Sequence, residues 1–285
     1  MTKESILVVG LGEIGRPLFE LIAESQKFLV FGLDINKQKM ESINQNPKNI
    51  LSKIDIIHIC IPFKNQQKFL RIVNDYITQY KPKLVIVNST VSVGSTKKIH
   101  DNCNCLVAHS PIRGVHKDLN HMKWEIKRWT KYVGGVTPKA AQTASAHFKK
   151  IGLNVKKLKS STETELAKLF ETTYRAWMIA CFQEMHRISK SFSGDFNDII
   201  DFIEDTHKTR FDRPIMFPDF IGGHCLIPNT KLLLDTYDSE FLKLILTSNE
   251  KRLVEIKDKS TKKEIKKINK RVIDLQKELM DLTKS

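Results

Sequence analysis

Short apolar runs alternate with longer amphipathic segments along the first half of the 285-residue chain. A run of about four to eight apolar residues is typical of a buried strand, and apolar residues spaced three and four apart are typical of a helix. We therefore predict strands at residues 6–9, 29–33, 56–61, 84–88, 106–109, 132–134 and 155–158. Strands that alternate with helices form parallel sheets, so the pattern predicts an α/β fold with a doubly wound, parallel Rossmann sheet.

Helix signals separate these strands. Apolar residues recur at helical spacing from Asn65 to Tyr80, which predicts the clearest helix of this part. Thr137 and Pro138 are typical of an N-cap and the first helical residue, and they predict a helix that runs to about Lys150.

After the last predicted strand the alternation gives way to helices. Thr162 and Glu165 have the spacing of a capping box, in which a hydroxyl and a carboxylate each satisfy an exposed backbone N–H. They predict the start of one long helix that ends near Gly194. We expect two domains, a Rossmann domain of residues 1–158 and an all-helical domain of residues 159–285.

The tail beyond Asp238 is again helical, and the spacing of its apolar residues alternates between three and four. Such spacing is typical of a coiled-coil seam, which here either packs on its own domain or joins two copies of the chain. We expect a homodimer through the helical domain. The seam residues are Ile265, Ile268, Val272, Leu275, Leu279 and Leu282.

Basic residues exceed acidic ones, with 47 Lys and Arg against 32 Asp and Glu and a formal charge of +15. A charge of this size attracts polyanions. The lysines are spread along the sequence, however, and the densest group, between Lys262 and Arg271, includes acidic neighbours on a predicted helix. A solvated helical face, or an anionic substrate or cofactor, explains the charge, and we expect no nucleic-acid partner.

The five cysteines have no CxxC spacing, and no signal-peptide pattern opens the sequence, so we expect a cytoplasmic protein with reduced cysteines. No apolar run reaches the roughly 18 residues of a membrane span, and we expect no membrane partner. His109, His116 and His121 lack cysteine or acidic partners at typical ligand spacing, and we expect no metal site.

A GxGxxG motif follows the first predicted strand and opens a helix. Gly10 allows a tight turn, Gly12 lets the backbone approach a pyrophosphate, and Gly15 lets the helix pack closely on the strand. Asp34 ends the second strand, where its carboxylate accepts hydrogen bonds from a ribose and repels a 2′-phosphate. The motif predicts NAD as the cofactor, while two nearby lysines keep NADP open as the less favoured choice. The expected cofactor-binding residues are Gly10, Gly12, Glu13, Ile14, Gly15, Asp34, Pro62, Ser89 and Thr90.

The segment Gly222-Gly223-His224-Cys225 places a thiol on a glycine turn. A thiol at the wall of a cleft is a candidate nucleophile, whereas a buried cysteine behind two turn glycines would serve packing alone. Residues upstream favour the first interpretation.

Several motifs occur together in one order along the chain. They are GxGxxG with Asp34, Ile-Cys-Ile-Pro at 59–62, Ser89-Thr90-Val91, Glu165-Leu166-Ala167-Lys168 and Gly222-Gly223-His224-Cys225. Over roughly residues 5–235 the chain therefore resembles the nucleotide-sugar dehydrogenases of the UDP-glucose and UDP-N-acetylmannosamine type. It is more distantly similar to the 6-phosphogluconate and 3-hydroxyisobutyrate dehydrogenases.

The resemblance implies an NAD-dependent oxidoreductase that acts on the CH–OH group of an anionic alcohol or sugar derivative. Hydride passes to NAD, and Cys225 traps the resulting aldehyde as a thiohemiacetal. A second hydride then leaves, and water hydrolyses the thioester to a carboxylate. Lys168 is the implied electrostatic or acid–base partner, because an ammonium favours a thiolate and stabilises an oxyanion.

The chain departs from this family at three places near the implied site. Thr172 stands where the family usually has an Asn, and Asn229 stands where it has an Asp. The segment 110–114 replaces a Pro-Glu pair, which leaves Asp118 and Glu125 as candidate substitutes for the family's glutamate.

About 60 mainly helical residues follow Cys225, where the family has a further Rossmann-like domain that closes over the nucleotide. We therefore expect a smaller anionic substrate that need not carry UDP. Arginine side chains suit its phosphate or carboxylate, with surface ion pairs as their alternative role. The expected substrate-binding residues are Arg113, Thr172, Arg213, His224 and Asn229.

Two alternatives remain open. A hydroxyacid dehydrogenase of the 3-hydroxyisobutyrate type would need Lys168 but no thiol. A catalytically idle NAD-binding or interaction protein would need neither, and the departures at Thr172 and Asn229 favour it.

Overall fold

The structure is a computed structural model that describes residues 3–282, without the side chains of Pro47 and residues 279–282. The chain divides after Lys168 into two compact units. The long helix α7 (Ser161–Ser191) begins in the first unit and continues into the second.

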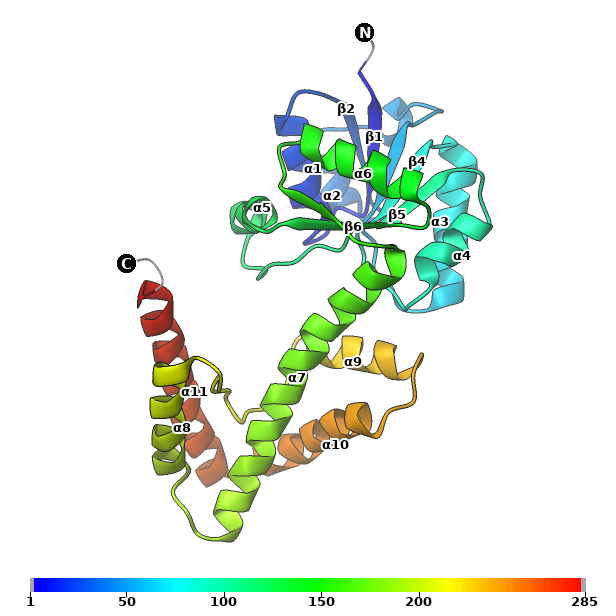
Figure 1. Cartoon of the computed structure of the whole chain (residues 1–285). Coiled ribbons are helices and arrows are strands. Elements are labelled where there is room, and N and C mark those ends of the chain that lie inside the picture. The colour runs from blue at the N-terminus through cyan, green and yellow to red at the C-terminus, as the bar shows by residue number, and fades with distance from the viewer. Residues whose placement is uncertain (1–2, 283–285) are drawn as a thin grey trace. The chain divides into compact units, whose positions relative to one another are not determined.

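A seven-stranded sheet forms the centre of the first unit, in the order β2-β1-β3-β4-β5-β6-β7 (Figure 1). The strands are β1 (Ser5–Val9), β2 (Leu29–Leu33), β3 (Ile56–Ile59), β4 (Leu84–Val87), β5 (Leu106–His109), β6 (Lys131–Gly135) and β7 (Val155–Lys157). Neighbouring strands are parallel except β5 and β6, where Ala108 lies opposite Gly135 in an antiparallel pair. The predicted α/β class and Rossmann sheet are confirmed, with this one antiparallel pair as the difference from a fully parallel sheet.

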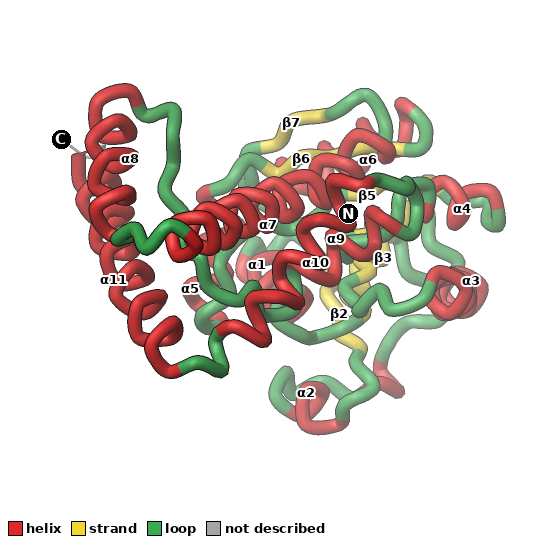
Figure 2. The backbone as a smooth tube through the Cα atoms, turned by 90° about the horizontal axis from the view of Figure 1, so that it is seen from below, coloured by secondary structure: helices red, strands yellow, loops and turns green. Residues whose placement is uncertain are grey.

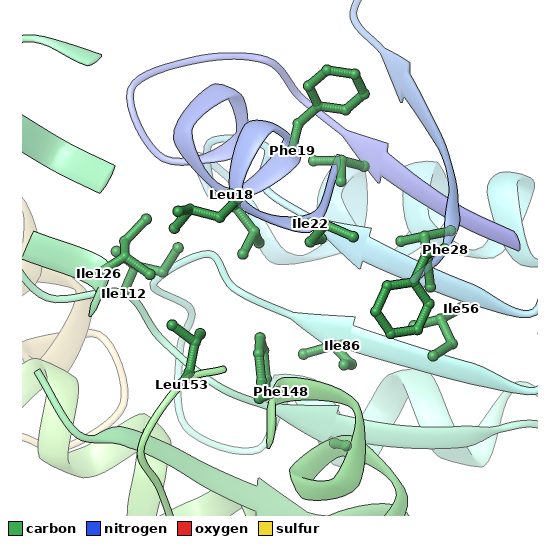
Figure 3. Close-up of a cluster of buried hydrophobic side chains, with 14 of the residues drawn as sticks. Leu18, Phe19, Ile22, Phe28, Ile56, Ile86, Ile112, Ile126, Phe148 and Leu153 are labelled. Atoms are coloured by element: carbon green, nitrogen blue, oxygen red, sulfur yellow. The ribbon is translucent and has the colours of Figure 1, made fainter. Parts of the chain in front are cut away.

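Helices cover both faces of the sheet. Successive strand residues point to opposite faces, so Ile6 of β1 packs in one apolar cluster and Leu7 in another. The first cluster lies beneath α1, α5 and α6 (Figure 3), and the second lies beneath α3 and α4. These elements are α1 (Gly15–Glu24), α2 (Lys37–Glu41), η1 (Pro47–Asn49), α3 (Gln66–Tyr80), α4 (Ser95–Asp101), α5 (Leu119–Arg128) and α6 (Pro138–Lys150).

Side-chain caps start two of the predicted helices. The side chain of Asn65 accepts a hydrogen bond from the backbone N–H of Lys68 at 3.1 Å, at the start of α3. The hydroxyl of Thr137 accepts one from the N–H of Ala140 at 3.2 Å, at the start of α6. Both predicted helix starts are confirmed.

The capping box predicted for the long helix is wrong in its residues. The hydroxyl of Ser160 accepts a hydrogen bond from the N–H of Thr162 at 3.1 Å and donates one to the carboxylate of Glu163 at 2.6 Å. Ser160 and Glu163 therefore cap α7, two positions before the predicted pair. Glu165 is fully buried and binds a different helix, as described below.

Over its described residues, the second unit contains the rest of α7 and four further helices. They are α8 (Phe196–Arg210), α9 (Leu226–Leu234), α10 (Glu240–Glu255) and α11 (Lys259–Leu282). The helices α8 and α11 run side by side (Figure 2), and Arg271 of α11 binds Glu204 of α8 at 2.7 Å.

The predicted seam on the tail lies on α11. Its members Ile265, Ile268, Val272 and Leu275 are buried within the chain, so this part of the seam packs on its own unit. The side chains of Leu279 and Leu282 lie outside the described residues. None of the described helices is long and apolar enough to cross a membrane.

Candidate active site

The glycine loop between β1 and α1 is fixed by two very close contacts. A Cβ on Gly15 would lie 1.7 Å from the carbonyl oxygen of Gly10, and a Cβ on Gly10 would lie 2.6 Å from the carbonyl oxygen of Cys60. Gly10 also has a φ of +90°, a conformation that other residues rarely adopt. Among the described side chains, a Cβ on Gly12 would meet only the Lys39 ammonium, at 3.8 Å. Packing therefore demands glycine at positions 10 and 15, whereas position 12 is open to a bound group.

Asp34 holds this loop from the end of β2. Its Oδ2 accepts a hydrogen bond from the backbone N–H of Leu11 at 2.7 Å, and its Oδ1 accepts one from the N–H of Asn36 at 2.9 Å. The Lys39 ammonium lies 3.6 Å from Oδ2. The carboxylate thus links the loop to the segment after β2. Of the other expected contacts here, Ile14 is half-buried at the start of α1, and the exposed Glu13 lies 3.7 Å from the His116 ring.

The loops after β3 and β4 are joined by Ser89. Its hydroxyl donates a hydrogen bond to the carbonyl oxygen of Ile61 at 2.6 Å, and its side chain is buried. Pro62 is exposed beside this bond, and Thr90 is half-buried. Both loops leave the carboxyl edge of the sheet, where ligands bind in open α/β sheets.

The first turns of α7 are anchored to the same edge. The carboxylate of Glu165 accepts hydrogen bonds from the N–H of Gly94 at 2.7 Å, the N–H of Thr96 at 2.9 Å and the Thr96 hydroxyl at 2.6 Å. These groups belong to the start of α4, so a side chain of α7 caps α4. Burial raises the pKa of Glu165 against the effect of its three hydrogen bonds.

His109 at the end of β5 is the second residue that holds the start of α7. Its Nδ1 lies 2.9 Å from the Thr164 hydroxyl, and its Nε2 lies 3.1 Å from the carbonyl oxygen of Ser89. Burial lowers the pKa of His109 to about 3, with smaller contributions from Lys131 and Lys168, so the ring is neutral. A carbonyl only accepts, and Nε2 therefore carries the proton. Lys168, one turn beyond Thr164 on α7, is placed by these contacts near the carboxyl edge of β5.

A buried lysine that the sequence analysis missed lies behind the loop after β5. The ammonium of Lys131 donates to the carbonyl oxygens of Ser110 and Pro111, at 2.7 and 3.0 Å. Burial lowers the pKa of Lys131 to about 7 and raises the pKa of the nearby Cys60 thiol to about 12. No sequence signal marks Lys131, because a lysine at the start of an apolar strand is usually solvated.

The same loop carries Arg113. Its guanidinium donates to the carbonyl oxygen of Thr130 at 3.0 Å and stacks over Trp129, 4.8 Å from the ring centroid. The candidate substitutes for the family's glutamate also have local contacts. Asp118 caps α5, and Glu125 accepts a hydrogen bond from the Trp129 indole at 2.6 Å.

In the second unit, the Gly-Gly-His-Cys segment is a turn that leads directly into a helix. Gly223 has a φ of +80°, and Cys225 occupies the N-cap position of α9. His224 and Cys225 are exposed. Backbone N–H groups at a helix N-terminus favour negative charge, which suits a thiolate or an oxyanion at this position.

Two of the three expected departures from the family's residues, Thr172 and Asn229, contact each other. The Asn229 amide donates to the Thr172 hydroxyl at 3.1 Å, and that hydroxyl lies 2.9 Å from the carbonyl oxygen of Leu169. Asn229 lies one turn after Cys225 on α9. Thr172 and Asn229 therefore join α7 to α9 through neutral groups. By contrast, Arg213 is exposed and pairs with the adjacent Asp212 at 2.7 Å.

A buried amide, also missed at the sequence level, fixes the chain just before this turn. Asn249 of α10 accepts a hydrogen bond from the N–H of Ile221 at 2.7 Å and donates one to the carbonyl oxygen of Ile221 at 3.1 Å. Gln183 of α7 donates to the carbonyl oxygen of Asp219 at 2.7 Å. Asn249 could have been found from the sequence, because it is a polar residue on the buried stripe of α10, between Ile245 and Arg252.

The chain is similar to known dehydrogenases along most of its length. Residues 162–251 match the central domain of the UDP-glucose/GDP-mannose dehydrogenase family. The UDP-N-acetyl-D-mannosamine dehydrogenase of Methanocaldococcus jannaschii is 26% identical over 283 residues, which cover 86% of this chain and 64% of that protein. The chain spans less than two thirds of the length of the first relatives it matches.

Solved dehydrogenase structures share the fold. The UDP-D-ManNAc dehydrogenase of Pyrococcus horikoshii aligns with a TM-score of 0.73 at 22% identity, over 87% of this chain and 68% of that chain. The 3-hydroxyisobutyrate dehydrogenase of Mycobacterium tuberculosis aligns with a TM-score of 0.65 at 15% identity, over 90% of this chain and 95% of that chain. The chain thus resembles the nucleotide-sugar dehydrogenases, and its residues 162–251 match the central domain of the UDP-glucose/GDP-mannose dehydrogenase family.

Proposed function

We propose that the protein is an NAD-dependent oxidoreductase that acts on the CH–OH group of an anionic alcohol or sugar derivative. The observation that carries this proposal is the position of Lys168 and Cys225. Both lie in the region that matches the family's central domain, with Lys168 on the anchored start of α7 and Cys225 at the N-terminus of α9.

The glycine loop supports NAD as the cofactor. Gly12 leaves open space beside the start of α1, and the N-terminus of a helix favours an anionic group such as a pyrophosphate. Asp34 supports NAD over NADP, because its carboxylate repels a 2′-phosphate. When bound, NAD supplies the acceptor for hydride. We propose that Gly10, Gly12, Glu13, Ile14, Gly15, Asp34, Pro62, Ser89 and Thr90 line this cofactor.

Lys168 and Cys225 are the proposed catalytic residues. The Lys168 ammonium would stabilise the alkoxide from which the first hydride departs. The Cys225 thiolate would then attack the aldehyde carbon, forming a C–S bond and placing negative charge on the oxygen. Loss of a second hydride would give a thioester, and water would release the carboxylate and the thiol. Arg113, Thr172, Arg213, His224 and Asn229 are the proposed substrate contacts.

The test counts hydrides. The full chain is incubated with NAD and, in separate reactions, with UDP-N-acetylmannosamine, UDP-glucose and 3-hydroxyisobutyrate. For the productive probe we expect two NADH for each molecule consumed and a carboxylate product. Cys225→Ser should yield at most one NADH for each molecule consumed, and Lys168→Met should lower kcat by roughly 100-fold or more. Complete two-hydride oxidation by Cys225→Ser would refute the thiol mechanism.

A simple hydroxyacid dehydrogenase is the second candidate. It is favoured by the coverage of 95% of the 3-hydroxyisobutyrate dehydrogenase chain and by the neutral Thr172–Asn229 pair. It predicts one NADH for each substrate molecule and full activity of Cys225→Ser. Specific NAD binding in titration calorimetry without turnover of any probe would instead support an idle NAD-binding protein.

We also propose a homodimer through the helical unit. Phe170 and Tyr174, one turn apart on α7, are 53% and 61% exposed, and large exposed apolar side chains often mark interfaces. Light scattering coupled to size exclusion should give twice the monomer mass of 32.9 kDa. A monomer at all concentrations would contradict the dimer.

A further inference from the structure

A pair of cysteines lies in the turn between α4 and β5. The Sγ atoms of Cys103 and Cys105 are 3.3 Å apart, close enough for one thiol to donate a hydrogen bond to the other. Cys103 is half-buried, and Cys105 is 8% exposed. Only Asn104 separates them in sequence. This turn precedes β5 and therefore lies at the amino end of that strand, whereas the glycine loop follows the carboxyl end of β1.

The surroundings of the pair make the two thiols unequal. The hydrogen bond from Cys105 lowers the pKa of Cys103 to about 6, with further contributions from the Cys105 backbone and from His100 on α4. The same hydrogen bond, together with burial, raises the pKa of the Cys105 thiol. The other neighbours are apolar residues of the cluster beneath α3 and α4. A thiolate beside a protonated thiol is the usual arrangement of a reactive dithiol.

We propose that Cys103 and Cys105 are a redox modification site that exchanges with small disulfides such as glutathione disulfide. The Cys103 thiolate attacks one sulfur of the external disulfide, whose S–S bond breaks and releases one thiolate. The Cys105 sulfur then attacks Cys103, its proton passes to the departing thiolate, and the second external thiol leaves. Two electrons pass from the cysteine pair to the external disulfide, which ends as two thiols.

The experiment follows one tryptic peptide of the folded, full-length protein. Cleavage after Lys98 and Arg113 yields residues 99–113, which contain Cys103 and Cys105 and no other cysteine. After incubation with glutathione disulfide, acid quench and alkylation, we expect this peptide to be lighter by two hydrogen atoms and to resist alkylation. The exposed Cys181 serves as the internal control, because a single thiol can only retain glutathione.

The outcome that overturns the proposal is equally specific. If Cys181 carries glutathione while peptide 99–113 is recovered with two alkylated cysteines, the pair is not a redox site. Stable glutathione on Cys103 in the wild type would also overturn it, because Cys105 should displace that group. Cys105→Ser is expected to stop at this mixed disulfide, and Cys103→Ser is expected to leave Cys105 largely unreacted because Cys105 is buried.

Alkylation kinetics give a second measurement on the reduced protein. In the wild type the rate at Cys103 should titrate with a pKa of about 6, and in Cys105→Ala it should move toward the ordinary value of 9.0. At pH 7 we expect alkylation of Cys103 to slow by roughly tenfold in the variant. An unchanged titration would show that Cys105 does not activate Cys103.

Discussion

The carboxylate of Glu165 accepts hydrogen bonds from both the backbone N–H and the hydroxyl of Thr96, at 2.9 and 2.6 Å. One residue near the start of α7 thereby satisfies the N-terminus of α4, which follows the loop after β4. The bond fixes the origin of the helix that carries Lys168, so its loss should affect both stability and the proposed catalysis.

Glu165→Ala should lower the free energy of unfolding by about 3 kcal/mol, because it leaves two buried donors of Thr96 and the half-buried N–H of Gly94 without acceptors. The half-buried capping residue Glu163 offers a control, and Glu163→Ala should lower the free energy of unfolding by less. Urea denaturation measures both variants. An equal loss in the two would contradict the role of Glu165.

The pH dependence of Glu165→Gln provides an independent check. Burial raises the pKa of Glu165 above 4.5, so folding favours the protonated carboxyl. The stability that Glu165 contributes relative to Gln should be fully present below pH 4.5 and decrease as the pH rises through the raised pKa. Unfolding of wild type and variant across this range measures the difference, and a constant difference would refute the raised pKa.

Lys131 should produce the opposite trend in the alkaline range. Its pKa is about 7 in the folded protein, against an ordinary value of 10.5, so folding releases its proton. The free energy of unfolding of the wild type, relative to Lys131→Met, should rise with pH between 7 and 10.5. Groups other than Lys131 titrate in both proteins, so their contribution cancels when the free energy of the variant is subtracted from that of the wild type. A flat difference would mean that the ammonium stays charged in the interior.

Substitutions in the glycine loop should separate folding from cofactor binding. Gly15→Ala brings a Cβ within 1.7 Å of the Gly10 carbonyl oxygen, and we expect a loss of about 3 kcal/mol or more in stability. Gly12→Ala has only the Lys39 ammonium nearby, at 3.8 Å, and should fold normally. Its affinity for NAD should nevertheless fall roughly tenfold in titration calorimetry, because the methyl group occupies the space proposed for the pyrophosphate. Unchanged affinity would contradict the proposed cofactor site.

Asn249 should control the order of the turn before Cys225. Asn249→Ala removes both hydrogen-bond partners of the Ile221 backbone and should lower the free energy of unfolding by about 2 kcal/mol. It should also speed hydrogen exchange at the Ile221 amide. Asn249→Asp keeps the acceptor for that amide, and its exchange should remain slower than in the alanine variant. Equal exchange in the two variants would show that the side chain does not hold Ile221.

The fold was largely predictable because its signals are local. Apolar runs marked each strand, and the caps at Asn65 and Thr137 marked two helix starts. The start of α7 was misjudged because Ser160 with Glu163 and Thr162 with Glu165 both fit the same local spacing. Only the folded chain shows that Glu165 faces α4, a contact between residues 69 positions apart in sequence.

By itself, the sequence determined the α/β class, the glycine loop and the order of motifs that carries the family resemblance. These follow from residue type and spacing along the chain. The tertiary structure alone decided that Thr172 bonds to Asn229, that Asn249 holds Ile221, and that Lys131 is buried behind the loop after β5. Each of these depends on burial and on contacts between distant segments, and a polar side chain has the same letter in the sequence whether it ends in solvent or in the interior.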